Sequence, residues 1–594
     1  MKKLLSYLFL LFSSYSLQAQ IYTDYLGAGH STGITVTSSD QFSTATGLKT
    51  IDGSGMNNDK MEASRFLAQA TMGYDMQMVE DLAGTDYEAW IDAQYAIPAT
   101  SMWNTLYTVW DEVLALHVAA GENPDDVAGP RERHVNYAWW TVNMTGEDIL
   151  RLKIAYSLSQ IFVVSHASNL AGHGDAMAHY YDMLINNSFG NFKNLLRDVT
   201  LHPTMGYYLS HLNNPKEDSA NNVHPDENYA REIMQLFSIG LHELNLDGSE
   251  KLDASGDPIP TYDNDDIKEF AKVFTGLGGG GVDADVNYSG SPYFGMSLGL
   301  VSKTDPMAMY QNFHETSSKE LLNGFIIPAG QDGMTDVEQT LDHLFNHANV
   351  GPFMAKRLIQ RLVTSNPSPQ YISRVAQAFN NNGNGVRGDM KAVIKAILLD
   401  PDARERAAML TNNTGRLKEP LVRYIQIAKS LPHDNPFDRY WLNGFAISRT
   451  LEQYALDAPT VFNFYIPDYT PNGPIGDDNL VAPEFQIFNA ISSIEFINRV
   501  NTWVVGLTIW FSNHGSYGDP NVDLDISGIQ EMAINPEELI NYLDILYTHG
   551  QLSDAMRNNI RETATQWTTG VYEYNRTRLI MYLLLISPDY GIMK

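Results

Sequence analysis

The sequence predicts an all-α protein, a single large and mainly helical globular domain with small β excursions. Apolar residues recur at helical spacing along most of the chain after Met61. Tyr, Trp and Phe are spread over the whole length, and no Pro- or Ser-rich linker divides it, which favours one continuous core. No repeat of fixed period is present, so a solenoid is not supported. We expect this helical domain to cover residues 59–594.

The first twenty residues have the pattern of a secretory signal peptide. Two lysines precede a mostly apolar run over residues 4–17, and Ala19 ends a small-residue cleavage site. The alternative is a buried N-terminal helix, which these flanks disfavour. The apolar run is shorter than the roughly 20 residues that span a bilayer, and no later segment approaches that length. We expect export to the periplasm or the cell exterior without a transmembrane span, and an extended arm over residues 21–58.

Helical periodicity is clearest in the second half of the chain. One apolar face, at spacing i, i+3, i+4, i+7, i+8, is formed by Met390, Val393, Ile394, Ile397 and Leu398. Similar faces are formed by Met354, Leu358 and Leu362, and by Leu539, Leu543 and Leu546. Further helices are expected over residues 148–165, 226–240, 263–276, 416–430 and 574–586.

Composition excludes several classes of function. The chain carries 70 acidic and 39 basic residues, a net charge of -31, and such a surface repels nucleic-acid phosphates. It has no cysteine, which excludes a disulfide framework, a thiolate nucleophile and a cysteine-ligated metal. No phosphate-binding loop, dinucleotide fingerprint or serine nucleophile elbow is present, so no nucleotide or flavin cofactor is expected. A divalent metal is left open.

The segment from His224 to Phe237 concentrates polar side chains on one helix. Glu227 and Arg231 are one turn apart, as are Asn228 and Glu232, so these four share a side. One interpretation is a solvated face with ion pairs between successive turns. The other is a polar cluster in a cleft, where the arginine binds an anion and a carboxylate moves a proton.

Several motifs resemble those of the bacterial family named domain of unknown function 1800. The signature is the Asn-Tyr-Ala-Arg-Glu run over residues 228–232 with the Leu-Phe-x-x-Gly helix end that follows it. Further motifs, in the family's order, are the Arg-Phe-Leu run at Arg65, Phe189 to Leu209 with His202-Pro203, Phe274-Thr275-Gly276, His314-Glu315 with Lys319, Gly388-Asp389-Met390, and Ser587-Pro588-Asp589-Tyr590. Two positions depart from the pattern, Leu277 for Trp and Glu315 for Asp. The resemblance implies a secreted, mainly helical protein and supplies no activity.

Histidines cluster between residues 166 and 242. Asp175, His179 and Asp182 fall at i, i+4 and i+7, on one face of a helix, and such an oxygen and imidazole set suits Zn²⁺, Mn²⁺ or Fe²⁺. The alternative is that Asp175 serves a cap or turn and that His179 is a surface residue.

Two functions from different classes follow from these patterns. The first is an acid/base or metal-assisted hydrolase or lyase acting on an extracellular polymer or glycan. Its expected catalytic residues are Glu227 or Glu232 as base, His314 as acid, Arg231 as anion stabiliser, and His202; Asn228, Lys319 and Arg65 are expected to contact substrate. The second is a non-enzymatic envelope protein that binds a polymer or a partner protein, or acts as a scaffold. The enzyme hypothesis requires His202, Glu227, Arg231 and His314 to converge in one pocket.

Overall fold

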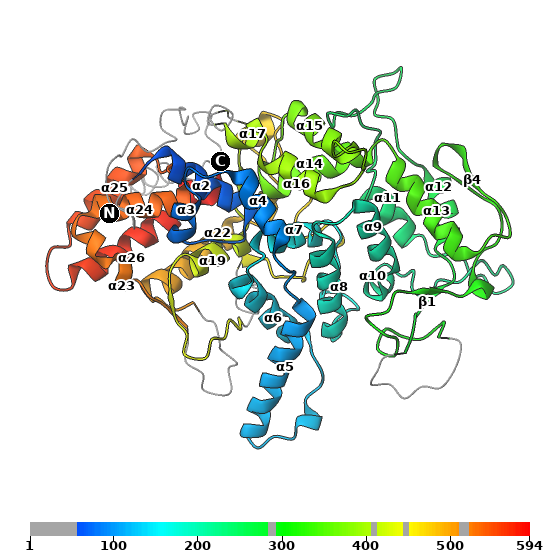
Figure 1. Ribbon diagram of the computed structural model, residues 1–594, viewed down its shortest axis with the longest axis horizontal. Helices are drawn as coiled ribbons and strands as arrows, with labels where there is room; N and C mark the ends of the chain where they lie inside the picture. The colour runs from blue at the N-terminus through cyan, green and yellow to red at the C-terminus, as the bar shows by residue number, and fades with distance from the viewer. Residues whose placement is uncertain (1–55, 283–292, 406–410, 412, 443–450, 510–521) are drawn as a thin grey trace, which may run out of the picture.

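The computed structural model describes residues 56–282, 293–405, 411, 413–442, 451–509 and 522–594. The predicted signal peptide and nearly all of the predicted arm lie outside these residues. Within the described chain, helices dominate and each paired strand has two or three residues, which confirms the predicted fold class (Figure 1). None of the described helices has the length and apolar character that crossing a membrane requires.

The N-terminal third of the described chain is a run of helices. They are α2 (Asn58–Ala70), α3 (Met76–Leu82), α4 (Tyr87–Ala96), α5 (Met102–Ala119), the 3₁₀ turn η1 (Pro124–Asp126), α6 (Glu132–Thr145) and α7 (Ile149–Ser159). Asn, Asp or Ser side chains cap the starts of α2 to α5 by accepting backbone N–H bonds. The long α5 projects at the lower edge of Figure 1 and packs on α6 and α8.

The centre of the molecule is built around α8. This part contains α8 (Gly174–Asn187), α9 (Phe192–Leu201), α10 (Pro203–Tyr208), α11 (Asn228–Gln235) and α12 (Asn264–Val273). The helix α8 contacts α5, α6, α7, α9 and α10, and most of its residues are buried. It therefore joins the N-terminal helices to the central ones and presents its remaining polar face between α5 and α9.

Small β excursions and helices follow the central group. The strands β1 (Leu277–Gly278) and β2 (Ala308–Met309) pair antiparallel, as do β3 (Lys319–Leu321) and β4 (Phe325–Ile327), with the 3₁₀ turns η2 (Gln311–Phe313) and η3 (Leu322–Gly324) between them. The helices are α13 (Gly333–Asn346), α14 (Val350–Leu362), α15 (Pro369–Asn380), α16 (Met390–Leu398), α17 (Pro401–Arg404) and α19 (Pro420–Lys429). The strand β3 packs on α12, and α14, α15 and α16 pack on one another.

The C-terminal part returns to the beginning of the chain. Its helices are α21 (Pro474–Asp477), η4 (Pro483–Gln486), α22 (Ala490–Val500), η5 (Asn501–Val505), α23 (Ser527–Gln530), η6 (Glu531–Ile534), α24 (Pro536–Leu543), η7 (Asp544–Thr548), α25 (Asp554–Thr565), α26 (Tyr572–Leu585) and α27 (Pro588–Gly591). Two strand pairs join β5 (Arg416–Leu417) to β8 (Ile592–Met593), and β6 (His433–Asp434) to β7 (Asp523–Leu524). The π-helical turn η7 contacts α2, so both ends of the described chain meet in one region of Figure 1.

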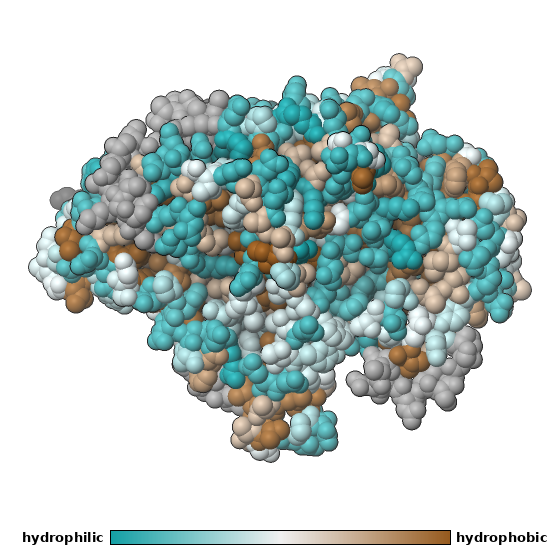
Figure 2. Space-filling view, viewed as in Figure 1, coloured by the Kyte–Doolittle hydropathy of each residue, from teal (hydrophilic) through white to brown (hydrophobic). Residues whose placement is uncertain are grey.

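The apolar faces predicted from periodicity are buried. All five predicted residues of α16 are buried, as are Met354, Leu358 and Leu362 of α14. The helix predicted over 148–165 ends earlier, at Ser159, and the chain leaves the helix through a turn at Gln160. Figure 2 shows a face that is largely hydrophilic, with hydrophobic residues in separate patches.

Candidate functional site

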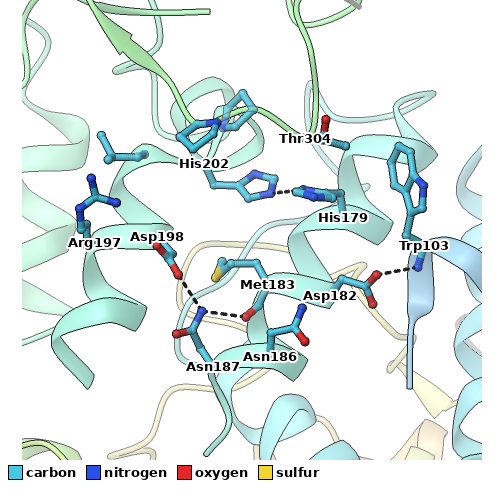
Figure 3. A pocket seen from close by; sticks show the side chains of 13 residues that line it. Trp103, His179, Asp182, Met183, Asn186, Asn187, Arg197, Asp198, His202 and Thr304 are labelled. Carbon is cyan, nitrogen blue, oxygen red and sulfur yellow. Dashed lines mark hydrogen bonds between the residues drawn. The ribbon is translucent and has the colours of Figure 1, made fainter. Parts of the chain in front are cut away.

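A surface hollow of about 490 Å³ lies where α5, α8, α9 and α10 meet (Figure 3). We call it the histidine hollow. It is lined by Trp103, His179, Asp182, Met183, Asn186, Asn187, Arg197, Asp198, Leu201, His202, Pro203, Thr304 and Pro306. Its volume falls within the roughly 300–1,000 Å³ that is usual for small-ligand sites.

The helix α8 supplies one wall of the histidine hollow. His179, Asp182 and Asn186 are spaced i, i+3 and i+7, so their side chains lie on one face. The opposite face buries large side chains such as Tyr180 and Leu184 in the core. The amphipathic pattern of this helix therefore fixes which side chains reach the hollow.

The junction of α9 and α10 supplies the second wall. His202 ends α9 and caps α10, and Pro203 takes the first position of α10, where its missing N–H is not needed. Asn187 donates from Nδ2 to Oδ2 of Asp198 at 2.9 Å, which ties the end of α8 to α9. Arg197, also in α9, pairs with Glu338 at 2.6 Å.

His179 and His202 form a hydrogen-bonded pair with a defined direction. The backbone N–H of Thr204 donates to Nδ1 of His202 at 3.2 Å, so the proton of neutral His202 is on Nε2. That Nε2 donates to Nδ1 of His179 at 2.9 Å, which places the proton of neutral His179 on its own Nε2. Burial lowers the pKa of both rings, and for His202 well below the usual value. The pair therefore favours an uncharged His179, and its Nε2–H, which has no hydrogen-bond partner among the described residues, is a donor.

Trp103 stands beside this pair at the start of α5. Its ring meets His179 edge to face, with centroids 5.6 Å apart and planes at 85°. The side chain is half-buried, so part of the indole is open to solvent at the hollow. An aromatic surface next to a fixed donor is an arrangement suited to ligand contact.

Asp182 holds the start of α5 in place. Its carboxylate accepts from the hydroxyl of Ser101 at 2.8 Å and from the backbone N–H of Trp103 at 3.1 Å, and also from the N–H of Met102. Burial raises the pKa of Asp182, although these three donors act in the opposite direction. The carboxylate acts across helices as a cap, and it thereby positions Trp103.

The predicted metal ligands are divided among other partners. Asp175 forms an ion pair with Lys303 at 3.4 Å, and Asp182 caps α5. Among the residues that the structure describes, no group of three or more His, Cys, Asp or Glu side chains is arranged to hold a metal ion. The spacing of Asp175, His179 and Asp182 is helical as predicted, but the structure does not assemble them as a ligand set.

The predicted cluster on α11 divides between the surface and the interior. Glu227 and Arg231 are 43% and 42% exposed and 3.7 Å apart, a loose ion pair between successive turns. Asn228 is exposed at the first turn. Glu232 faces inward, where burial raises the pKa of its carboxyl while Arg231 lowers it, and its Oε2 has no hydrogen-bond partner among the described residues. Glu227 precedes the helix without capping it, and Oδ1 of Asp226 accepts from the backbone N–H of Asn228 at 2.9 Å.

His314 and Lys319 belong to an enclosed network around Asp336. His314 is fully buried, with Nδ1 bonded to the carbonyl of Thr275 at 2.8 Å and Nε2 bonded to Asp336 at 3.1 Å. Lys319, also fully buried, donates to the same carboxylate at 2.7 Å and to the carbonyl of Glu315 at 2.6 Å. Both ring nitrogens of His314 are thus engaged within the protein.

Arg65 is also enclosed. Its side chain is 2% exposed and donates to the carbonyl of Arg404 at 2.5 Å. Burial, with the positive charge of Arg404 as a smaller cause, lowers the pKa of Arg65 to about 9. This position gives Arg65 no surface on which a large substrate could be contacted.

The structure therefore brings together only part of the predicted site. His202 shares the histidine hollow with His179 and Asp182, two residues predicted as metal ligands. Glu227, Arg231, Glu232 and His314 do not line this hollow. The convergence that the hydrolase hypothesis requires is not present around His202.

Sequence reasoning missed most of the hollow. The sequence patterns did not predict five residues of its lining, Trp103, Asn186, Arg197, Asp198 and Thr304. Extending the polar stripe on α8 by one turn from Asp182 would have found Asn186. The contribution of α5 and of the 304–306 loop has no local signal, because it depends on tertiary packing.

Comparison with protein families identifies the relationship. The model of the family described as "Protein of unknown function (DUF1800)" matches residues 65–592, nearly the whole described domain. The chain belongs to this family. No curated protein and no solved structure matches the chain.

The signature segment of this DUF1800 protein has a clear packing role. Tyr229 of α11 is fully buried, stacks on His211 with ring centroids 3.8 Å apart and meets Phe274 edge to face at 5.0 Å. Its hydroxyl donates to Thr200 at 2.7 Å. The signature helix thereby fixes α9 and α12 relative to each other, and α9 carries one wall of the hollow.

Proposed function

We propose that this DUF1800 protein is exported through its N-terminal signal peptide and binds an extracellular glycan in the histidine hollow. The observation that carries the proposal is the His179–His202 pair, which presents an uncharged donor at a half-open site beside Trp103. This is the binding alternative among the two functions that the sequence suggests.

The lining of the hollow supports a glycan as the ligand class. Sugars offer hydroxyl groups that donate and accept, and C–H faces that pack on aromatic rings. Asn186 supplies an amide, Asp198 a carboxylate and His179 an N–H, while Trp103 supplies the ring. Few and spaced polar groups around an aromatic surface are typical of sites that orient a polar, uncharged ligand.

The net charge of the chain also indicates which class of glycan is favoured. A net charge of -31 repels polyanions, so a neutral or cationic glycan is favoured over an anionic one. Arg197 does not reverse this preference, because its guanidinium is paired with Glu338.

Hydrolysis of the bound glycan is the second candidate function. The histidine hollow holds two carboxylates, Asp182 and Asp198, and burial raises the pKa of Asp182, as a general acid requires. Against it, the carboxylate of Asp182 is occupied by donors at the start of α5. Hydrolysis would be favoured over binding alone if the wild-type protein released reducing ends from an oligosaccharide. The Asp198→Asn variant should then bind the oligosaccharide but release no reducing ends.

The first test is the replacement of Trp103. Trp103→Ala removes the aromatic surface, and affinity for a neutral oligosaccharide is expected to fall about tenfold or more, since burying such a ring contributes about 1.5–3 kcal/mol. Isothermal titration calorimetry with a panel of neutral oligosaccharides of three to six units provides the measurement. Trp567→Ala is the matched control, because Trp567 is 45% exposed and lies outside the hollow. Equal losses in both variants, or binding unchanged in Trp103→Ala, would contradict the proposal.

The second test is the pH dependence of binding. Burial lowers the pKa of His179 more than the nearby Asp182 and Asp305 raise it, so the ring is protonated only below its usual value of 6.5. Protonation would put a second N–H on Nδ1, facing the N–H of His202, and break the pair. Affinity is expected to be constant from pH 8 to 6.5 and to fall at more acid pH. An affinity that increases on acidification would show that a charged imidazolium binds the ligand instead.

A further inference from the structure

A second, small cavity of about 30 Å³ lies where α2, α7, α19 and β8 meet. We call it the cationic cavity. It is lined by Ala68, Thr71, Met72, Tyr74, Lys153, Arg416, Lys418, Glu419, Val422, Gln426 and Met593. The space is about twice the roughly 10–15 Å³ that one water molecule needs, so any occupant is small.

The surroundings of this cavity carry more positive than negative charge. Each charged side chain of the group is less than 10% exposed, and the cations are Lys153, Arg361, Arg416, Lys418 and Arg423. The carboxylates that act on them are Glu419 and Glu484. The lining itself holds three cations, Lys153, Arg416 and Lys418, and one carboxylate, Glu419, which is an excess of positive charge in a chain whose net charge is -31.

Both carboxylates form close ion pairs with the same cation. Arg416 pairs with Glu419 at 2.9 Å and with Glu484 at 3.1 Å. Lys418 instead donates to the carbonyl of Tyr547 at 2.7 Å and lies 4.7 Å from the ring centre of Tyr590. These neutral contacts orient the ammonium of Lys418 without neutralising it.

Lys153 is the unpartnered group. Its side chain is 3% exposed and lines the cavity, and its ammonium has no hydrogen-bond or ion-pair partner among the described residues. Burial lowers the pKa of both Lys153 and Lys418 to about 7, with a neighbouring arginine as a further cause in each case. The negative charge that acts on Lys153 is the carboxylate of Glu419, which is already paired with Arg416 at 2.9 Å and only partly offsets the burial. A buried ammonium without a closely paired counter-ion is costly, and it either loses its proton or acquires an anion.

We propose that the cationic cavity binds a monovalent anion of the size of chloride, held by the ammonium groups of Lys153 and Lys418. The other donors of the lining are already engaged, since Thr71 donates to the carbonyl of Leu67 at 2.8 Å and Gln426 to that of Tyr74 at 3.1 Å. Phosphate, sulfate and larger carboxylates exceed the space.

Such an anion would connect distant parts of the chain. Lys153 lies in α7, Lys418 follows β5, and Met593 belongs to β8 at the other end of the sequence. These residues come together only in the folded state, so an anion bound there stabilises that state by mass action. The site is independent of the histidine hollow and of the glycan proposal.

The test compares two sodium salts at equal ionic strength and neutral pH. Thermal unfolding of the protein is followed from 5 to 500 mM sodium chloride and, in parallel, in sodium gluconate, whose anion is too large for the cavity. The midpoint is expected to be higher in chloride by about 2 °C or more at the top of the range. Equal midpoints in the two salts would overturn the proposal.

Two variants test whether the difference between the two salts arises from the cationic cavity. Lys153→Met should abolish the difference between the two salts. Lys429→Met is the matched control, because Lys429 donates to the carbonyl of Asn143 and does not line the cavity; it should keep the difference. If Lys153→Met fails to fold, anomalous diffraction from wild-type crystals soaked in sodium bromide shows whether the cavity binds an anion. A bromide peak beside the Lys153 ammonium supports the site, and a cavity without one refutes it.

Discussion

Replacement of Asp336 by alanine is expected to lower the free energy of unfolding by about 3–5 kcal/mol, because it leaves buried charge without a partner. Lys319 is fully buried and pairs with this carboxylate at 2.7 Å. Burial opposes the charged form of Asp336, yet the hydrogen bonds from His314 and Lys319 hold its pKa below the usual value. The carboxylate is therefore the centre of the network that joins β3 to α13.

The measurement is equilibrium unfolding in urea. Asp332→Ala is the control, since Asp332 caps the same helix from an exposed position by accepting the N–H of Thr335 at 3.1 Å. Loss of that cap should cost only about 1 kcal/mol. If Asp336→Ala matched this small loss, the enclosed network would not be a stabilising element, and a chemical role for His314 would have to be considered again.

The helical core was predictable because it follows from local spacing. The five apolar residues predicted for one face of α16 are all buried, and α12 and α19 lie within their predicted ranges. The small strand pairs were expected only as unspecified excursions. Strands such as β5 and β8 pair residues from distant parts of the sequence, so no local pattern reveals them.

The site was only partly predictable for a related reason. His202 and His179 were singled out separately, and their hydrogen bond depends on how α8 packs against α9 and α10. His314 and Lys319 were predicted to meet a substrate, because the sequence does not show that Asp336, in the next helix, satisfies both. Residue type and spacing identify polar side chains, whereas tertiary packing decides whether their partner is a ligand or the protein.

A loss of stability as large as that of Asp336→Ala is expected when the carboxylate of Glu419 is replaced. One of its oxygens accepts from Arg416 at 2.9 Å, and the other accepts from Tyr156 at 2.7 Å and from two glutamine amides, Gln160 and Gln453. Glu419→Gln keeps the shape of the side chain, but its NH₂ group must face either the guanidinium of Arg416 or the three other donors. In both orientations a donor meets a donor. We expect a loss of about 3–5 kcal/mol in the free energy of unfolding. Glu243→Gln, which affects a half-exposed pair with Lys251, should change it by about 0–1 kcal/mol.

The acid dependence of stability distinguishes the charge of Glu419 from its shape. Burial alone would raise its pKa, but Arg416 and Arg361 overcome this and lower the pKa to about 2. In the unfolded chain the carboxyl takes up its proton near its usual value of 4.5, so the unfolded state binds more protons between pH 4.5 and 2. Wild-type stability should therefore fall as the pH decreases through this range. Asp468, whose pKa is also about 2, contributes in the same range, so the quantity to compare is the difference between wild type and Glu419→Gln. The difference in the free energy of unfolding should shrink toward pH 2, because the wild type then loses the charge that the variant never had. A difference that stays constant with pH would mean that the geometry of Glu419, and not its charge, is stabilising.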